Sequence, residues 1–276
     1  MNFSIYSSWE IAKKEFYEHL KTKRLIIIGG LYIAGFLLSV GILSHYSSHS
    51  PEDFPSIMGS AHSIVSIFYI ILPITLSYDL IVRERSRKSI YLLLSKPVSR
   101  EEIIFGKFVG VLLIICCVII PIATAGHLIT IAYCGFPSID SIARAYAYIG
   151  IVILGSGCYI SFSMLFSTIT RTTATSIISS LIVGWFGLNM LYPITLIINF
   201  LSGGSSSTPW YSKIAYAISP SNNMGAAQRI LTDRLMGIPT QNLYPISTSQ
   251  SLISLVIFLL VSSIITTFLF HRRELN

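Results

Sequence analysis

Six long runs of apolar residues divide this chain, with polar connections between them. A helix needs about 20 largely apolar residues to cross a bilayer, and every run meets that length. The predicted spans are 25–43, 59–81, 104–133, 143–167, 174–200 and 252–270. The pattern predicts an all-α integral membrane protein with six transmembrane helices that form a single transmembrane domain over residues 1–276.

Residues 5–24 show helical periodicity instead of a continuous apolar run. One face of this segment carries Trp9, Ala12, Phe16 and Leu20, whereas charged residues recur on the other face: Glu10, Lys13, Lys14, Glu18 and Lys21. This spacing predicts an amphipathic elbow helix. Its tryptophan-bearing face and basic flanks are typical of a helix that lies among lipid headgroups, so membrane lipids are expected partners.

Residues 201–250, between the fifth and sixth runs, are too many for a structureless connection. The segment contains aromatic residues of the kind enriched at membrane interfaces, namely Trp210, Tyr211 and Tyr216. We expect short re-entrant or surface helices here that cap the outer side before the last span.

Composition and charge support this topology. The chain is 53% hydrophobic and 11% charged, against roughly 25% charged residues in a soluble domain. Fifteen of the 19 Lys and Arg residues fall in the N-terminal segment, in the stretch from Arg83 to Lys107 around the connection after span two, in the connection after span four or at the C-terminus. The positive-inside rule therefore predicts a multi-pass protein of the cell membrane with both termini in the cytoplasm. Because the basic residues follow the topology, they do not indicate a nucleic-acid partner.

The connection between spans two and three, residues 82–103, is the most distinctive segment. Ser99 and Glu102 match a capping box at the start of the third helix. Before Pro97, the piece 89–95 (SIYLLLS) is apolar and has basic residues on both sides. A solvated positive-inside loop explains the basic residues but not the leucines, so we interpret this segment as a docking element for a cytoplasmic partner.

The same segment resembles the signature loop of ABC-2-type transporter permeases. The matching positions are Asp79, Glu84, Leu93, Leu94, Pro97, Ser99, Arg100, Ile103, Gly106 and Lys107. The resemblance covers the whole chain, including the elbow helix, the six spans, the stretch 218–231 and the C-terminal tail. The tail is similar to that of the shorter members, among them the permease associated with nitrous-oxide-reductase maturation. Lys88-Ser89 departs from the Gly-Thr found in many members.

The resemblance implies a permease subunit of an ATP-driven transporter, with export as the usual direction. It implies a pair of separate cytoplasmic ATPase subunits that bind ATP and Mg²⁺, and a second copy of this chain or a homologous permease. The expected ATPase-coupling residues are Glu84, Leu93, Leu94, Pro97, Ser99 and Arg100, and the expected loop anchors are Asp79, Arg83 and Lys107. Gly106-Lys107 lacks the glycine and the Ser/Thr of a Walker A motif, so we expect neither catalysis nor a cofactor in this chain.

Other candidate residues have weaker support. Asn189 and His127 lie within predicted spans and are candidates for a substrate path, although a hydrogen bond between helices also explains such an asparagine. A metal site near His45, His49, Glu52 and Asp53 is conceivable, but scattered histidines meet by chance easily. An intramembrane protease leaves the loop unexplained. A secondary transporter or a non-transporting membrane scaffold remains an alternative, although the spans contain few acidic residues for ion coupling.

Overall fold

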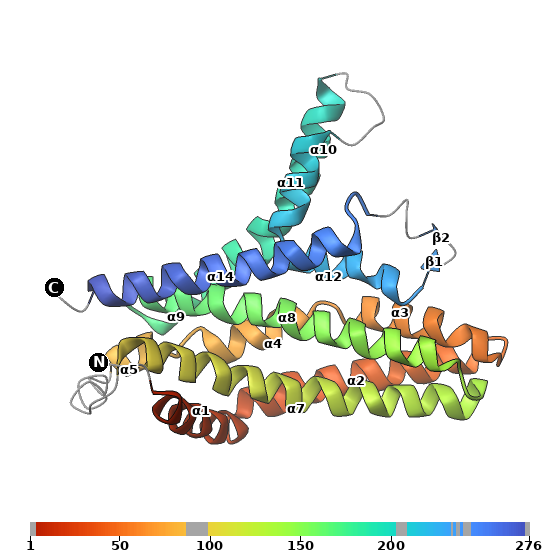
Figure 1. Cartoon of the computed structure of the whole chain (residues 1–276), viewed down its shortest axis with the longest axis horizontal. Coiled ribbons are helices and arrows are strands. Elements are labelled where there is room, and N and C mark those ends of the chain that lie inside the picture. Colours follow the sequence, from red (N-terminus) through yellow and green to blue (C-terminus); the bar gives the residue numbers. More distant parts are fainter. Residues whose placement is uncertain are drawn as a thin grey trace.

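The computed structural model describes residues 4–86, 99–202, 209–232, 234–235, 238–239 and 244–273. Four long helices run beside one another along the long axis of the molecule (Figure 1): α2 (Lys23–His45), α7 (Arg100–Cys134), α8 (Ile139–Ile169) and α14 (Thr248–Arg273). Both termini lie at the same end of this bundle, together with α5 (Val82–Ser86). We call this end the terminal end.

Five helices of the described chain are long and apolar enough to cross a membrane, and a bent pair makes a sixth when it is counted as one span. The predicted all-α integral membrane class is therefore confirmed. The fifth span is a succession of α9 (Thr173–Ser179), the π-helical η2 (Ser180–Gly187) and α10 (Leu188–Leu201). The described strands, β1 (Arg234–Leu235) and β2 (Ile238–Pro239), have two residues each and pair in the antiparallel direction.

The second span is broken, whereas the sequence predicted one helix over 59–81. After the short η1 (Pro51–Asp53), α3 (Phe54–Ile64) and α4 (Phe68–Ser77) meet at a 46° bend. The break in the span is a local feature of the backbone. The residues between the two helices form tight i→i+3 hydrogen bonds, such as the one from Phe68 N–H to Val65 O. A hydrogen bond of 2.6 Å between His62 Nδ1 and the Tyr69 hydroxyl also bridges the break. Pro73 lies inside α4 and not at the bend.

The elbow helix α1 (Ile5–Leu20) buries part of the face that the sequence assigned to lipid. Trp9 and Leu20 are nearly half exposed, but Ala12 is fully buried against α7. The buried stripe of α1 is instead polar in large part and consists of Ser8, Ala12, Glu15 and His19. The face that periodicity assigned to lipid is therefore divided. Part of it contacts protein, and a stripe containing Trp9 remains exposed. The helix also ends at Leu20, so Lys23 and Arg24 belong to α2.

Two glycines of α7 explain how closely α1 approaches. A Cβ atom on Gly106 would lie 2.6 Å from the Ser8 carbonyl oxygen, and one on Gly110 would lie 2.8 Å from the Ala12 carbonyl oxygen. Both distances are too short for a side chain. The small residues Ser8 and Ala12 face the two glycines, so the two backbones touch in the way that small residues at four-residue spacing permit in membrane helices.

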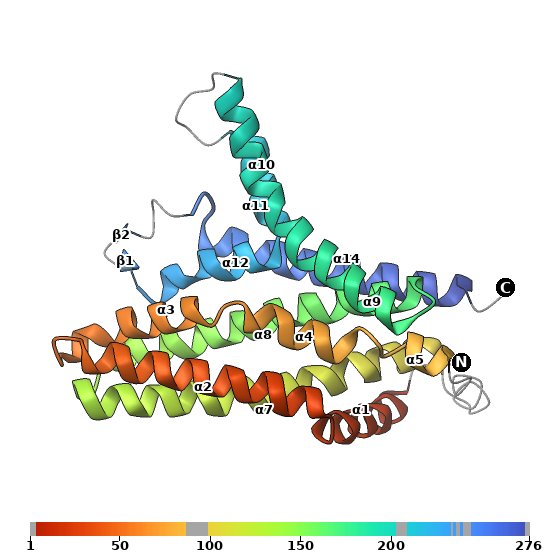
Figure 2. The ribbon, with the colours of Figure 1, turned by 180° about the vertical axis from the view of Figure 1, so that it is seen from behind.

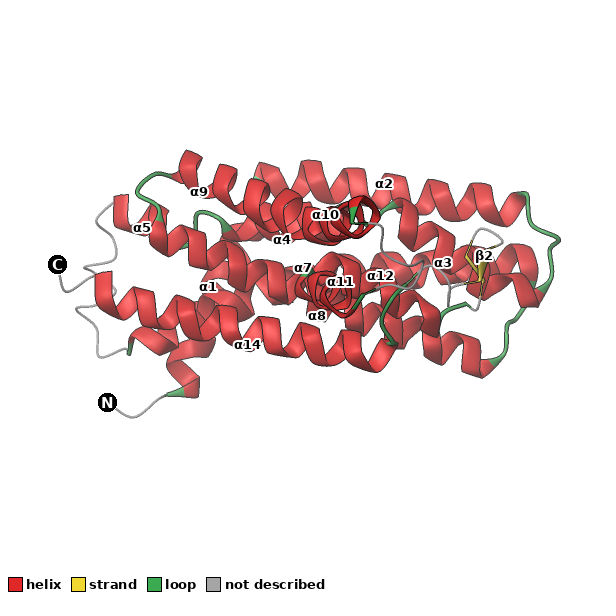
Figure 3. Ribbon diagram, turned by 90° about the horizontal axis from the view of Figure 1, so that it is seen from above, coloured by secondary structure: helices red, strands yellow, loops and turns green. Residues whose placement is uncertain are grey.

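Short helices precede the last span, in the segment that the sequence predicts to lie on the outer side, and we call them the outer helices. These are α11 (Trp210–Ile218), α12 (Pro220–Ala226) and the 3₁₀ helix η3 (Ala227–Ile230). As Figures 1 and 2 show, α10 and α11 pack as a pair that points away from the bundle, while α12 returns along it. From above, the pair is seen nearly end-on over the middle of the molecule (Figure 3).

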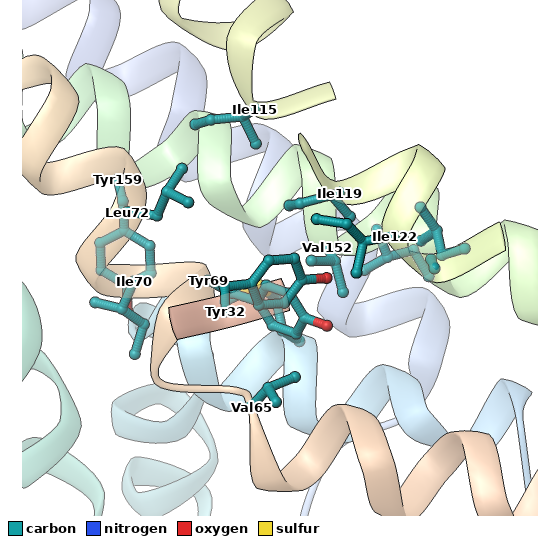
Figure 4. Packing of buried hydrophobic residues seen from close by; sticks show 14 of the residues in the cluster. Tyr32, Val65, Tyr69, Ile70, Leu72, Ile115, Ile119, Ile122, Val152 and Tyr159 are labelled. Carbon is teal, nitrogen blue, oxygen red and sulfur yellow. The ribbon is translucent and has the colours of Figure 1, made fainter. Parts of the chain in front are cut away.

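One apolar core joins the helices of the bundle. Tyr32 of α2 and Tyr69 of α4 are almost completely buried, with ring centroids 5.8 Å apart, and they lie beside Ile119 and Val152 (Figure 4). Lipid chains are as apolar as leucine, so burying apolar side chains does not by itself drive membrane helices together. The helices associate through close packing of this kind. The core therefore fixes the positions of α2, α4, α7 and α8, against which α1 packs at the terminal end.

The glycine contacts lead to a stability prediction. We expect Gly106→Ala to destabilise the protein by about 1–3 kcal/mol, since the added methyl group meets backbone atoms of α1. The matched control is Gly41→Ala, where no atom lies within 4 Å and alanine favours the helix by up to about 1 kcal/mol. Melting temperatures in one detergent would test this. Equal melting temperatures for the two variants would contradict the close approach.

Candidate functional site

A buried ionic cluster lies where α1, α5 and α7 meet. The Lys107 ammonium of α7 donates to Glu15 Oε1 of α1 at 2.5 Å and lies 2.8 Å from Glu84 Oε1 of α5. Lys107 and Glu15 are each 1% exposed, and Glu84 is 9% exposed. Charges so far from water are stable only when they are paired, so this contact fixes all three elements relative to one another.

A second pair fixes the start of α2 to the end of span two. Asp79 is 1% exposed, and its Oδ2 accepts a hydrogen bond from the Arg24 guanidinium at 3.0 Å. Arg83, one turn further along the chain, is 3.8 Å from the same oxygen and also 3.4 Å from Glu18 of α1. Asp79 and Arg83 thus form an i,i+4 ion pair, but Arg24 makes the shorter contact with Asp79. We call the two ionic groups together the charged junction.

The charged junction and its surroundings hold both ends of the segment 82–103. At the start of this segment, the Arg85 guanidinium donates to the Thr168 carbonyl of α8 at 3.2 Å. At its end, the predicted capping box is present, with the Ser99 hydroxyl accepting from Glu102 N–H and Glu102 accepting from Ser99 N–H. Glu102 also accepts a bond of 2.6 Å from the backbone N–H of Ser4, ahead of α1. Helix α1 thus touches both ends of the segment.

Burial and pairing have opposite effects on the acidic and imidazole groups of α1. Burial raises the pKa of Glu15, but the positive charge of Lys107 and its hydrogen bond outweigh this, so the pKa lies below its usual value. Burial lowers the pKa of His19, and the nearby Glu15 and Asp79 only partly oppose this effect. The folded state therefore favours a charged Glu15 and a neutral His19.

The coupling residues predicted from sequence are only partly within the described chain. Glu84 lies inside the charged junction, and Ser99 caps α7. Arg100 donates to the His271 carbonyl of α14 at 3.2 Å. The remaining three predicted residues lie outside the described residues: Leu93, Leu94 and Pro97. The three predicted anchors, Asp79, Arg83 and Lys107, all belong to the charged junction.

The two candidates for a substrate path lie in separate places. Asn189 donates to Trp185 O, and its carbonyl oxygen accepts from the hydroxyls of Ser219 and Ser221. It therefore ties the fifth span to the outer helices, which matches the helix–helix role considered for it. His127 is 3% exposed and lies against Phe54 and Tyr146.

The histidines of the first outer loop do not form a metal centre in the described part of the chain. Over these residues, no three His, Cys, Asp or Glu side chains gather closely enough to hold an ion. Asp53 instead accepts a bond of 2.7 Å from the Ser48 hydroxyl and completes a capping box with Ser50. These contacts give Asp53 a structural role.

Sequence reasoning missed the partners on α1 and α2, namely Glu15, His19 and Arg24. A signal for the first two was present. Ser8, Ala12, Glu15 and His19 share one helical stripe, and Gly106 and Gly110 have the spacing of a small-residue contact on α7. Read together, these patterns indicate a helix pair with a buried charge beside it. Nothing comparable in the sequence joins Arg24 to Asp79.

Comparison with known proteins identifies the family. The model of the family described as ABC-2 family transporter protein matches residues 9–275. The chain belongs to the ABC-2 transporter family. The charged junction is thus a feature of an ABC-2 protein, formed in part by Asp79, Glu84 and Lys107, which are among the positions that resemble the family's signature loop.

Two curated relatives are similar over a shorter stretch. Both carry the name "Probable ABC transporter permease protein NosY". The protein from Pseudomonas aeruginosa is 33% identical over 106 residues, which cover 37% of this chain and 38% of that protein. The one from Stutzerimonas stutzeri is 35% identical over 106 residues, covering 37% of each chain. The chain thus matches well under half the length of either relative.

The buried lysine gives a mutational prediction. We expect Lys107→Met to destabilise the protein by about 3–5 kcal/mol, because the buried Glu15 and Glu84 then both lose the ammonium group that lies within 2.8 Å of them. Adding Glu15→Gln and Glu84→Gln removes those charges, and most of the melting temperature should return. Lys13→Met is the control, since Lys13 pairs with Glu10 at the exposed surface of α1. A triple variant no more stable than Lys107→Met would contradict the ionic explanation.

The low pKa of His19 predicts a pH dependence. The unfolded chain binds a proton at His19 below about pH 6.5, while the folded chain resists it, so stability falls as the pH drops below this value. We expect His19→Gln to flatten the decline in melting temperature between about pH 6.5 and pH 5. The measurement is a series of melting curves for both proteins. Parallel curves would show that His19 is not responsible.

Proposed function

We propose that this chain is the permease subunit of an ATP-driven ABC transporter that works as an exporter. Residues 1–276 form one permease domain with both termini in the cytoplasm, as the Lys and Arg distribution favours. The expected partners are a pair of cytoplasmic ATPase subunits, which bind ATP and Mg²⁺, and a second permease copy. Family membership supports the transporter role. The observation that carries the coupling role is the charged junction, where both ends of segment 82–103 are fixed to α1 and the bundle.

The proposed coupling follows from the cost of separating buried charges. The ATPase closes on ATP and displaces segment 82–103, in which Leu93, Leu94 and Pro97 are the proposed docking residues. Glu84 cannot leave Lys107 without removing one of the two carboxylates that neutralise this buried ammonium, a change worth several kcal/mol. The displacement therefore reaches α7 through Lys107 and α1 through Glu15. The bundle shifts between two states because the partner makes different contacts with each.

In this proposal Glu84 acts through Lys107 and is a positioning residue. Arg100 has a similar positioning role, because its hydrogen bond to the His271 carbonyl joins the start of α7 to the end of α14. Neither residue has to touch the ATPase for its replacement to affect coupling. This differs from the direct contact that the signature-loop resemblance implies for Glu84. The docking contact itself is assigned to residues 89–97.

The test is a purification of the tagged chain from its native membrane in mild detergent. We expect an ATPase with a Walker A motif to copurify in stoichiometric amount, and to be lost when residues 89–97 are scrambled in a chain that still inserts. Glu84→Gln should keep the ATPase bound but lower the vanadate-sensitive ATP hydrolysis of the complex severalfold. Glu10→Gln, on the exposed face of α1, is the control.

The outcomes separate the alternatives. Copurification without an effect of Glu84→Gln would support the permease assignment and contradict the role of the charged junction. The absence of any ATPase, with the chain intact, would favour a secondary transporter or a scaffold.

A further inference from the structure

A groove of about 380 Å³ opens between α7 and α14 at the terminal end of the bundle. Its deeper walls are apolar and include Phe105, Phe108, Leu259 and Leu260. Phe105 and Leu260 are 50% and 53% exposed, so the groove faces the side of the bundle, where lipid surrounds a membrane protein. At its mouth, an adjoining recess is bordered by Glu101, Thr267 and His271.

The groove is polar at one end and apolar along its length. Eleven residues of helix separate His271 from Leu260, which is about 17 Å along the axis of α14. The hydrocarbon core of a bilayer is about 30 Å thick, so one leaflet contributes about 15 Å. The apolar part therefore has the depth of a single leaflet, and the polar mouth falls at headgroup level.

Charges of both signs lie at this mouth. Glu101 is exposed and makes no ion pair with any residue that the structure describes. Two guanidinium groups contact residues that border this mouth. Arg100 donates to the His271 carbonyl at 3.2 Å, and the Arg272 guanidinium lies 5.5 Å from the Phe268 ring centroid. A ligand that suits this mouth carries a cation for Glu101 and an anion for Arg272.

We propose that the groove binds one bilayer phospholipid with a primary-amine headgroup. The amine pairs with Glu101, the phosphate lies toward Arg272, and one acyl chain follows Phe105, Phe108 and Leu260. In the orientation proposed above, the lipid belongs to the cytoplasmic leaflet. Charge complementarity carries the choice of headgroup, because an anionic lipid without an amine leaves Glu101 unpaired and a quaternary amine donates no hydrogen bond. The lipid fills the space between α7 and α14 beside the capping box of segment 82–103.

The test uses the purified full-length chain, delipidated in detergent and supplied with one lipid at a time. The lipids are phosphatidylethanolamine, phosphatidylcholine and phosphatidylglycerol with identical acyl chains. We expect phosphatidylethanolamine to raise the melting temperature the most, and Glu101→Gln to remove its advantage over the other two. Glu10→Gln, at the exposed surface of α1, should keep that advantage. Equal shifts with all three lipids, or an unchanged advantage in Glu101→Gln, would overturn the proposal.

A second measurement locates the lipid. Phosphatidylethanolamine with a photoreactive group in its acyl chain should label peptides that contain residues 101–108 and 257–267. A bulky side chain in the wall, Ser263→Trp, should reduce this labelling. Labelling spread over all spans, or unaffected by Ser263→Trp, would contradict the site. The ATPase test of the permease assignment does not depend on these results, so failure of the lipid site leaves that assignment unchanged.

Discussion

The Lys107 ammonium lies within 2.8 Å of carboxylates from two other elements, and the packing of the terminal end depends on this contact. An ion pair with so little exposure holds its geometry closely, because any separation leaves a charge without water or a partner. Two features of the helices bring Lys107 and Glu15 into contact. The glycines at 106 and 110 let the backbone of α1 approach α7, and the following turns then place Glu15 beside the lysine. The close backbone approach and the buried charge are thus parts of a single arrangement.

This arrangement changes the meaning of an amphipathic N-terminal segment. A helix that only lies in the headgroup layer is held by the burial of its apolar face and by attraction to lipids, and it can move along the membrane surface. Helix α1 is instead held by a backbone contact at Gly106, by an ion pair at Glu15, and by the Ser4 N–H bond to Glu102. It therefore belongs to the same rigid unit as the start of α7, and its exposed stripe still contains Trp9 for contact with lipid.

Hydrophobic patterning predicted the fold class and most of the spans, because length and apolar content decide whether a helix can cross a membrane. The capping box at Ser99 was also predictable, since it depends on residues only three apart. The pairing of Arg24 with Asp79 was not, because 55 residues separate them and only the tertiary fold brings them together. The face of α1 was predicted only in part, for a related reason, because Trp9 and Leu20 are exposed but Ala12 is buried. Periodicity shows which residues share a stripe, but it does not show whether lipid or another helix covers that stripe.

The break in the second span has a consequence for how motion travels through this protein. Helix α4 leads to Asp79 and Glu84 at the terminal end, whereas α3 is tied to the outer helices by the bond between Ser63 and Gln228. A continuous helix would transmit a push along its axis as a stiff rod. Here the two halves meet at a 46° joint, spanned by the contact between His62 and Tyr69. A displacement of α4 at the terminal end therefore reaches α3 through a bend and a side-chain contact, and not along one continuous hydrogen-bonded helix.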